Sequence, residues 1–400
     1  VMEMEMLQGV NIIDLSTVIA GPYCTNLLAD FGAFVIKVEQ PSGGDPFRRL
    51  GPYHKKVAIR HASLNRNKKS VTLDLRTEKG KEMFFKLIEK ADVVVENFKT
   101  GTLDKWGISV EKMREHNPKI IITHITGYGQ TGPNAHMPGF GTPATAFSGL
   151  TYITGHPDRP PVSPSFSMTD YIAGLYACFS TMMALYHRDA LHGKGQEIDI
   201  SLYESLFRML GSHIADYYSN GVIAERAPIP VSQASTCGIY KTKANQWAIV
   251  VCSTDRTWTY ITRAMKREDF QTNPKFVTMA DRLQNNQELD DYVRNWVATL
   301  DFADLKKILN DEGVPADKVN TIKDCFEDSH FQARENIVTK YYAPVDEEVA
   351  MPGIIPKFSE TPGQIKWVGP ELGEHNAEIY SQWLGLNEND LAALKEEGVI

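Results

Sequence analysis

Cysteine is scarce in this sequence. Only five of the 400 residues are cysteine, they lie far apart, and none belongs to a Cys-x-x-Cys pair. A disulfide framework and a thiolate zinc site both need paired cysteines, so we expect neither. The scattered thiols favour a reducing compartment.

Net positive charge and long apolar runs are also lacking. Lys and Arg number 42 against 50 Asp and Glu, which argues against an extended surface for nucleic acid. The most apolar stretch, residues 171–186, is shorter than the roughly 20 residues that span a bilayer and predicts a buried core helix. The scattered histidines predict no metal site. The acidic first residues contain no targeting signal, so we expect a cytoplasmic protein without nucleic-acid or membrane partners.

The composition is that of a globular protein, with 42% hydrophobic and 23% charged residues. Its length allows two to three domains. Apolar β-branched segments alternate with amphipathic ones in the first third of the chain, which predicts an α/β fold with a parallel sheet covered on both faces. The predicted strands are residues 10–15, 33–39, 70–75, 92–96 and 119–125, and the predicted helices are 25–30, 79–90 and 110–116.

The second half of the chain predicts a long apolar helix from Tyr171 and another helix from Tyr203 into Tyr218. A domain boundary is expected near Gly221, and residues 225–330 predict a smaller α+β domain. Further predicted elements are strands at 198–202, 238–241 and 247–252 and helices at 376–384 and 388–397.

Gly127, Gly129 and Gly132 form a G-x-G-x-x-G pattern directly after a predicted strand. A dinucleotide site needs the last glycine to open a helix, with an acidic residue about 20 positions later. Here Pro133 follows the last glycine and the next acidic residue is Asp158. We therefore expect this loop to line some other cleft.

Ligands of parallel α/β sheets bind at the carboxyl ends of the strands. In the first loop, Ala20 and Gly21 allow close approach to the backbone, and the helix that starts near Pro22 offers amides to an anion; a plain tight turn explains these residues equally well. The candidate loops are residues 16–22, 97–98, 127–132 and the approach to Asp170.

Charged residues allow two interpretations each. Four basic residues surround one predicted strand, and they form either a solvated face or a site for a phosphate-bearing ligand. They are Arg66, Lys68, Lys69 and Arg76.

Asp170 opens the most apolar helix, where a carboxylate caps the helix and stabilises it by roughly 1 kcal/mol. Alternatively, it serves as a nucleophile. The residue pattern alone favours the cap.

The whole chain resembles the family III CoA-transferases, also called the L-carnitine dehydratase/bile acid-inducible protein F family, which includes formyl-CoA:oxalate and carnitine CoA-transferases. The order and spacing of many short motifs carry the resemblance. They are DLS (14–16), AGPYC (20–24), GA (32–33), VIKVE (35–39), GD (44–45), NRNKKS (65–70), ADVVVENF (91–98), GYGQTGP (127–133), the glycine at 363 and LGEH (372–375).

The resemblance implies that Asp170 is the nucleophile of a CoA-transferase, which moves CoA from an acyl-CoA to a free carboxylic acid through an aspartyl anhydride and an aspartyl-CoA thioester. CoA enters as a substrate, and no tightly bound cofactor is expected. Carnitine-type members are the most similar around residues 203–221. The implied CoA-binding residues are Val18, Ala20, Leu73, Leu75, Arg76, Asn97, Phe98 and Lys105.

The resemblance also implies a fold. A Rossmann-like large domain is built from both chain ends, residues 1–220 and 335–400, and the smaller α+β domain covers residues 225–330. Two copies are expected to interlock as a homodimer. A backbone amide near residues 232–238, or around Ala20, is our hypothesis for the donor to the oxyanion.

Some residues depart from the family pattern. Residues 231–235 read VSQAS where formyl-CoA transferases have a run of glycines, so formyl-CoA:oxalate specificity is not expected. Gly141 stands at a frequently acidic position and Thr145 at one that is often Gln. The related α-methylacyl-CoA racemases need a histidine at the position of Phe140 for proton transfer. A racemase-like isomerase and a non-catalytic CoA-binding protein are the alternatives.

Overall fold

The computed structural model describes residues 4–229 and 238–400. The chain divides into two compact units. The first comprises residues 1–153, 162–224 and 334–400, and the second comprises residues 154–161 and 225–333. Within the described ranges, no helix is both long enough and apolar enough to cross a membrane.

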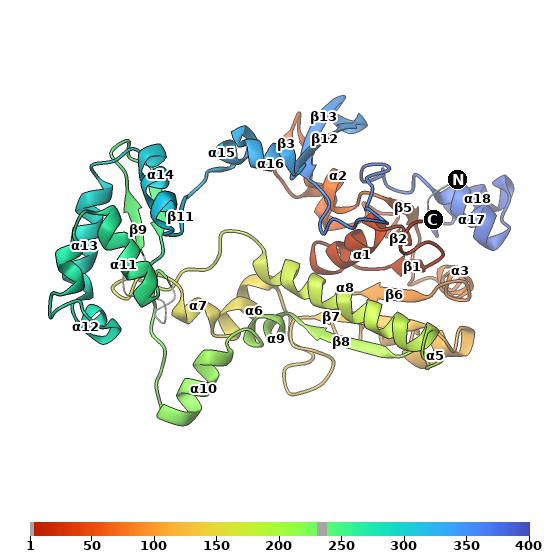
Figure 1. Ribbon diagram of the computed structural model, residues 1–400. Helices are drawn as coiled ribbons and strands as arrows, with labels where there is room; N and C mark the ends of the chain where they lie inside the picture. Colours follow the sequence, from red (N-terminus) through yellow and green to blue (C-terminus); the bar gives the residue numbers. More distant parts are fainter. Residues whose placement is uncertain (1–3, 230–237) are drawn as a thin grey trace. The chain divides into compact units, whose positions relative to one another are not determined.

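A six-stranded parallel sheet forms the centre of the first unit (Figure 1), with strand order β5-β2-β1-β6-β7-β8. The expected α/β fold with a parallel sheet is therefore confirmed. Its inner strands are rich in Val and Ile, the composition of strands that are buried on both faces. The strands are β1 (Asn11–Asp14), β2 (Phe34–Glu39), β5 (Lys68–Thr72), β6 (Val93–Glu96), β7 (Ile121–Thr126) and β8 (Glu197–Ser201).

Helices cover both faces of this sheet. One hydrophobic core joins strand residues such as Ile12 and Val95 to α1 (Ala20–Asp30) and α8 (Met168–Asp189). The opposite face packs against α3 (Glu78–Ile88), α5 (Val110–His116) and α17 (Asn376–Leu384). The remaining helices of this unit are α2 (Arg60–Leu64), α4 (Thr102–Lys105), α6 (Gly141–Phe147), α7 (Leu150–Ile153), α9 (Leu202–Phe207), α10 (Gly211–Asn220), α18 (Glu388–Glu396) and the 3₁₀ helices η1 (Pro46–Arg49) and η4 (Ala343–Val345).

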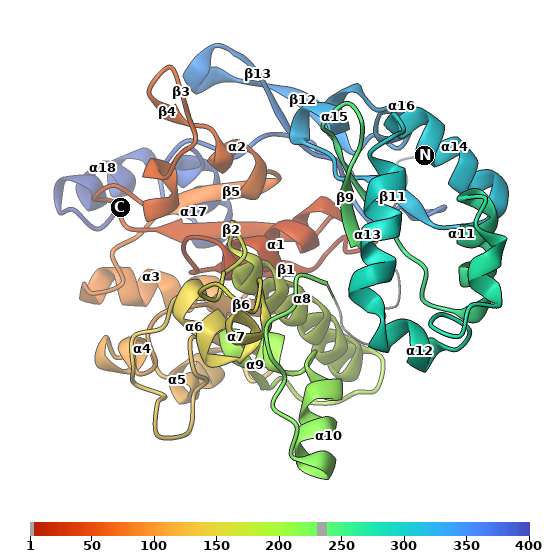
Figure 2. The ribbon, with the colours of Figure 1, turned by 90° about the vertical axis from the view of Figure 1, so that its left-hand side faces the viewer.

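The C-terminal segment completes the first unit next to β5 (Figures 1 and 2). Asn376 accepts a hydrogen bond from the Thr72 amide at 2.8 Å, and the Tyr380 hydroxyl donates to the Thr72 carbonyl at 2.6 Å. The edge strand is thus capped by chain from the other terminus. The same segment contributes the antiparallel pair β12 (Ile337–Tyr342) and β13 (Glu347–Pro352), and β3 (Tyr53–His54) pairs with β4 (Val57–Ala58).

The second unit has a core of its own around Trp258, Phe270 and Phe276. Its antiparallel sheet has the order β11-β10-β9, and helices pack against it. The elements are β9 (Gly238–Lys241), β10 (Trp247–Val250), β11 (Ala316–Lys318), α11 (Asp255–Ala264), η3 (Glu268–Gln271), α12 (Met279–Gln284), α13 (Asn286–Val297), α14 (Phe302–Glu312), α15 (Ile322–Glu327) and α16 (Ser329–Ala333).

Three elements differ from those predicted from the sequence. The helix expected from Tyr203 into Tyr218 is two helices, α9 and α10, and the second begins at Gly211, a residue of low helix propensity. Helix α1 begins at Ala20, five residues earlier than expected. Strand β5 covers Lys68–Thr72 rather than 70–75, because the two lysines belong to the strand.

Candidate active site

The carboxyl ends of the parallel strands lie along one edge of the sheet. Strands β1, β6 and β7 are neighbours, so the loops that follow Asp14, Glu96 and Thr126 lie next to one another. This is the edge at which such sheets bind ligands. It brings together three of the loops selected from the sequence.

The loop after β1, residues 16–19, is held by side chains from other segments. Asn97 accepts a hydrogen bond from the Thr17 amide at 2.8 Å and donates one to the Thr17 carbonyl at 2.7 Å. The Val18 amide donates to Asp45 at 3.0 Å. Val18 has a φ of +64°, a left-handed conformation that is unfavourable for a β-branched residue. These side chains therefore hold a strained loop in place.

Asp45 belongs to a buried network of charges beneath this loop. Its carboxylate lies 2.8 Å from Lys37 Nζ, and both side chains are fully buried. Lys37 also donates to the Ser16 carbonyl at 2.9 Å. Burial alone would lower the pKa of Lys37, but the surrounding carboxylates raise it above its usual value. Lys37 is therefore charged at neutral pH.

A second buried pair joins Asp14, the last residue of β1, to Lys68 at 3.0 Å. Burial alone would raise the pKa of Asp14, but Lys68 and Lys37 lower it to about 2. Burial lowers the pKa of Lys68 to about 8 against the opposing effect of Asp14. The carboxylates beneath the loop are thus compensated by lysines.

The predicted basic cluster is largely internal. Lys68 is fully buried, and Arg66 forms hydrogen bonds of 3.0 and 2.8 Å with both oxygens of Asp30. The solvated-face interpretation is therefore wrong for Arg66 and Lys68, and the phosphate-site interpretation is wrong for the fully buried Lys68. Arg76 is exposed and paired with Asp74 at 2.9 Å.

Asp170 is the third residue of α8 and lines a pocket of about 430 Å³ in the first unit. The N-cap of α8 is Ser167, so Asp170 lies in the first turn and not at the cap position. Val18 and Ile19 from the loop after β1 line the same pocket. Hydroxyl groups are abundant in its wall, which includes Thr142, Thr145, Ser163, Ser165, Ser167 and Thr169.

The carboxylate of Asp170 has no ion pair within residues 4–229 and 238–400. Burial raises its pKa to about 6. It is therefore mostly ionised at pH 7, yet more basic than an ordinary aspartate and thus a better nucleophile. A Cβ atom at Gly141 would collide with Asp170 Oδ2 and lie 3.2 Å from its Cγ, so the glycine makes room for the carboxylate.

The implied CoA-binding residues differ in what their side chains offer. Val18 is half-buried beside Asp170, and Ala20 is buried at the start of α1. Leu73 and Leu75 are buried in the core that covers one face of the sheet. A contact of these two leucines with CoA would therefore use their backbone atoms.

The implied contacts after β6 are also partly engaged within the protein. The amide of Asn97 holds Thr17, as described above. Phe98 is half-buried and packs edge-on against Trp106, with ring centroids 5.3 Å apart. Lys105 is exposed at the end of α4. Of these residues, Lys105 has the charge most accessible to a phosphate.

The glycine-rich loop after β7 opens no helix at Gly132, and the next helix, α6, begins at Gly141. The geometry of a dinucleotide fingerprint is thus missing, as the sequence predicts. In the described part of the chain, no three His, Cys, Asp or Glu side chains are placed to hold a metal ion. Residues 232–237 of the oxyanion hypothesis lie outside the described residues.

Two features of this region were missed in the sequence. The Lys37–Asp45 pair supports the loop after β1, and its only signal is a lysine inside an apolar strand. Arg60 was not among the basic residues considered, although it lines a cavity behind the same loop.

Comparison with known proteins connects this geometry to a family. The sequence model described as CoA-transferase family III matches residues 7–376. The chain is 38% identical to the succinyl-CoA–D-citramalate CoA-transferase of Chloroflexus aurantiacus over 395 residues, 98% of each protein. It is also 38% identical to the beta subunit of that organism's succinyl-CoA–L-malate CoA-transferase over 397 residues, again 98% of each.

A solved structure agrees with the fold. A CAIB/BAIF family protein from Brucella suis is 31% identical and superposes with a TM-score of 0.83. The superposition covers 95% of this chain and 99% of the other.

Proposed function

Because this chain belongs to CoA-transferase family III and is a CoA-transferase, we propose that Asp170 is the nucleophile of the transfer. The observation that carries this proposal is an unpaired carboxylate with a raised pKa in a pocket at the ligand-binding edge of the sheet. Perturbed carboxylates of this kind cluster at catalytic sites.

The proposed chemistry consists of four acyl transfers. An Asp170 oxygen attacks the thioester carbonyl of the donor, and CoA leaves as the thiolate, which gives a mixed anhydride. The thiolate attacks the aspartyl carbonyl, releases the donor acid and forms an aspartyl-CoA thioester. The acceptor carboxylate then attacks this thioester, and the thiolate attacks the resulting anhydride at the acceptor's carbonyl. The new acyl-CoA leaves, and the Asp170 carboxylate is regenerated.

Each attack develops negative charge on a carbonyl oxygen, so a nearby hydrogen-bond donor lowers the barrier. The amides of Ile19 and Ala20, at the start of α1, have no hydrogen-bond acceptor in the described part of the chain. We place the donor there. The clamped loop after β1 would keep these amides fixed during the reaction.

The substrates we propose are dicarboxylic acids and their CoA thioesters, with succinyl-CoA as the donor. Both relatives compared above are named for succinyl-CoA and for citramalate or malate. All three acids carry two carboxyl groups. This replaces the carnitine-type substrates that the sequence favours.

The test is intact-mass spectrometry of the purified protein after incubation with succinyl-CoA. We expect a CoA adduct in the wild type that borohydride removes, because borohydride reduces the aspartyl thioester. Asp170→Asn should form no adduct. Asp189→Asn is the matched control, because Asp189 ends the same helix and is exposed and paired with Arg188. An adduct that persists in Asp170→Asn would overturn the assignment.

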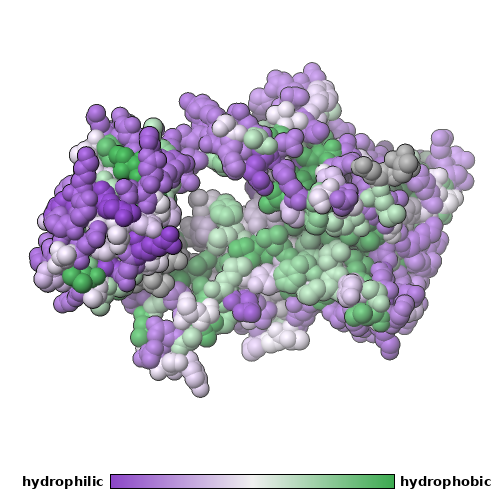
Figure 3. Space-filling model, viewed as in Figure 1, coloured by the Kyte–Doolittle hydropathy of each residue, from purple (hydrophilic) through white to green (hydrophobic). Residues whose placement is uncertain are grey.

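We also propose that two copies of the chain form a dimer. Apolar side chains are exposed along α8 at helical spacing, and Figure 3 shows apolar residues gathered in this region. Exposed patches of this kind mark association surfaces. Light scattering should give the mass of two chains, and the mass of a single chain would contradict the proposal. The exposed residues are Leu175, Phe179, Met183 and Tyr186.

A further inference from the structure

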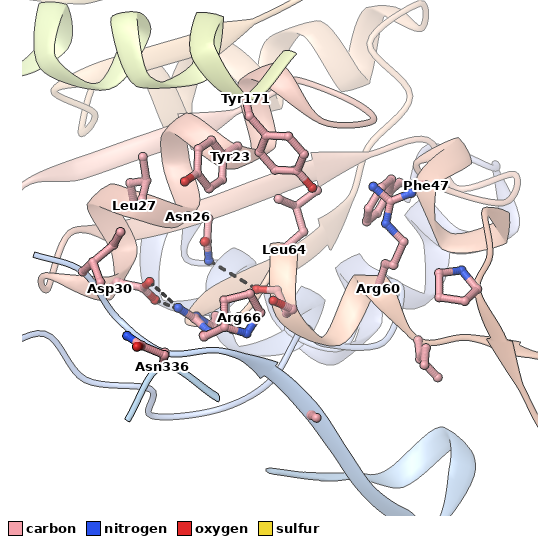
Figure 4. Close-up of a pocket in the computed structure, with 17 residues that line it drawn as sticks. Tyr23, Asn26, Leu27, Asp30, Phe47, Arg60, Leu64, Arg66, Tyr171 and Asn336 are labelled. Carbon is pink, nitrogen blue, oxygen red and sulfur yellow. Dashed lines mark hydrogen bonds and ion pairs between the residues drawn. The ribbon is translucent and has the colours of Figure 1, made fainter. Parts of the chain in front are cut away.

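A second cavity of about 520 Å³ lies in the first unit between α1, α2 and the segment after β13 (Figure 4). Its volume is in the range of about 300–1,000 Å³ that is typical of small-molecule sites. The wall is mostly apolar, with Leu27, Leu64 and Ile355 among its residues. Two arginines, Arg60 and Arg66, provide its positive charge.

The two arginines differ in their partners. Arg66 binds both oxygens of Asp30 and also donates to the Pro352 carbonyl at 2.6 Å, as Figure 4 shows for the carboxylate. The Arg60 guanidinium lies over the Phe47 ring, 4.8 Å from its centroid. Within residues 4–229 and 238–400 it forms no hydrogen bond and no ion pair. Arg60 therefore has all five of its N–H donors free for a ligand.

This cavity and the Asp170 pocket share one wall. Ile19, Phe47 and Leu64 pack together as a small core, and Val18, Tyr23 and Tyr171 pack against it. The loop residues of this cluster line the Asp170 pocket, whereas Phe47, Leu64, Tyr23 and Tyr171 line the cavity of Arg60. Tyr171 directly follows Asp170 in α8. The free guanidinium and the reactive carboxylate are thus separated by a single layer of side chains.

We infer that Arg60 binds the second carboxylate of a dicarboxylic acid whose first carboxylate reacts at Asp170. The inference rests on the proposed function and identifies the residue that selects its substrate class. A guanidinium matches a carboxylate with two parallel hydrogen bonds. The contact with the Phe47 ring restricts the guanidinium, so less freedom is lost on binding.

The Asp170 pocket provides no cation for the second carboxylate of a dicarboxylic acid. Its wall contains hydroxyl groups but no lysine or arginine among the described residues. A dicarboxylate bound there would hold its second charge in a partly apolar space without a partner, which is unfavourable. Arg60 supplies that partner. Rotation of the Tyr171 and Ile19 side chains, with the backbone of the loop held in place, would join the two spaces when substrate binds.

The experiment compares acids of equal length with one and two carboxylates. Transfer of CoA from succinyl-CoA to succinate, carrying an isotope label, and from butyryl-CoA to labelled butyrate is measured for the wild type and for Arg60→Gln. We expect kcat/KM with the succinate pair to fall roughly 30- to 300-fold, the loss typical of an unpaired buried charge. The butyrate reaction should change less than threefold, which also reports that the variant is folded.

The matched control is Arg267→Gln. Arg267 also lies over a phenylalanine ring, 3.8 Å from the Phe270 centroid, but belongs to the second unit. It should leave the preference for succinate over butyrate unchanged. Arg60→Lys, which keeps the charge without the planar fork, should recover part of the loss.

The possible failures are distinguishable. If the wild type transfers CoA to neither acid and forms no Asp170 adduct, the proposed function fails. If the wild type prefers succinate and Arg60→Gln keeps the same preference, the role of Arg60 is wrong while the proposed function stands. An equal loss with both acids would also refute the inference, because it would show that Arg60 supports the structure and not the second carboxylate.

Discussion

Asp45 and Asp170 lie on opposite sides of one short loop and have contrasting surroundings. Asp45 is fully buried, pairs with Lys37 and accepts hydrogen bonds from the amides of Val18 and Phe47. Asp170 is half-buried and has no cationic partner in the described part of the chain, and desolvation raises its pKa to about 6. One carboxylate is thus stabilised and the other is left basic.

The loop after β1 thus lies between a carboxylate that stabilises the structure, Asp45, and a carboxylate that is available for reaction, Asp170. A carboxylate that is fully paired is a weak nucleophile, because its lone pairs are engaged and its pKa is low. The neighbouring Asp14, with a pKa lowered to about 2, is the clearest example. Asp170 keeps its reactivity because the lysines of this region lie beneath the loop, where they pair with other acids.

The largest expected effect is the loss of a buried countercharge. Lys37→Met should reduce the free energy of unfolding by about 3–5 kcal/mol, because Asp45 is left buried without its cation. The measurement is urea unfolding at pH 7. Lys79→Met is the control, since Lys79 pairs with Glu397 on the surface and should cost less than about 1 kcal/mol. Equal losses in the two variants would refute the importance of the buried network.

Substitution of Asp170 should increase the free energy of unfolding rather than reduce it. Its pKa is raised from 3.8 to about 6 in the folded protein, so ionisation destabilises the fold as the pH rises through this interval. Asp170→Asn stays neutral and should be more stable than the wild type by at most about 3 kcal/mol at pH 8. The gain should vanish below about pH 3, where the wild-type carboxyl is protonated in both the folded and the unfolded state.

Thermal unfolding from pH 3 to pH 8 provides this measurement. The slope of the stability difference against pH is the informative quantity, since a constant offset would arise from packing alone. Asp189→Asn should show no gain at pH 8, because its carboxylate pairs with Arg188 and its pKa is lowered, not raised. A wild type more stable than Asp170→Asn at pH 8 would contradict the unpaired state of this carboxylate.

The position of the Asp170 carboxylate depends on Gly141. Gly141→Ala should lower kcat by up to about 100-fold, because the new Cβ displaces Oδ2 and misplaces the nucleophile. The dissociation constant for CoA should be unchanged. Gly211→Ala is the control, since this glycine also begins a helix and its Cβ would meet no atom within 4 Å. Equal kcat values for both variants would show that the rate does not depend on the space that Gly141 leaves for the Asp170 carboxylate.

Much of the large sheet could be predicted from the sequence, because its strands are continuous apolar runs and its helices alternate with them. The predicted range of strand β5 began too late, at residue 70, because Lys68 and Lys69 have the character of surface residues. Lys68 is buried only because Asp14, which is distant in sequence, lies 3.0 Å from its Nζ. The residues next to Lys68 in the sequence cannot reveal an ion pair with a residue that is distant in the chain. The interruption between α9 and α10 had a local signal, Gly211, that was overlooked.

Residue pattern, family resemblance and contacts in space each identify different residues of the candidate site. Residue pattern alone favoured Asp170 as a cap, and only the resemblance of the whole chain indicated a nucleophile. The role of Asn97 in holding Thr17 depends on the neighbouring positions of β1 and β6, which sequence spacing does not reveal. Arg60 was missed because a single arginine gains meaning only when its neighbours in space leave it unpaired.

The smallest expected effect concerns the strain that Asp45 holds in the loop. Val18→Gly removes the cost of a left-handed conformation, roughly 1–2 kcal/mol for a residue with a side chain. Asp45→Asn keeps an oxygen that accepts from the Val18 amide but weakens the bond by removing its charge. If Asp45 acts by holding Val18, its substitution should cost less when residue 18 is glycine.

A double-mutant cycle isolates this coupling, because the individual effects of each substitution on packing and on Lys37 cancel. We expect a coupling free energy of about 1 kcal/mol between Val18→Gly and Asp45→Asn, measured by urea unfolding. Additive effects would mean that Asp45 stabilises the protein only through Lys37. A positive coupling would show that the paired carboxylate of Asp45 maintains the conformation of the loop that also lines the pocket of the unpaired Asp170.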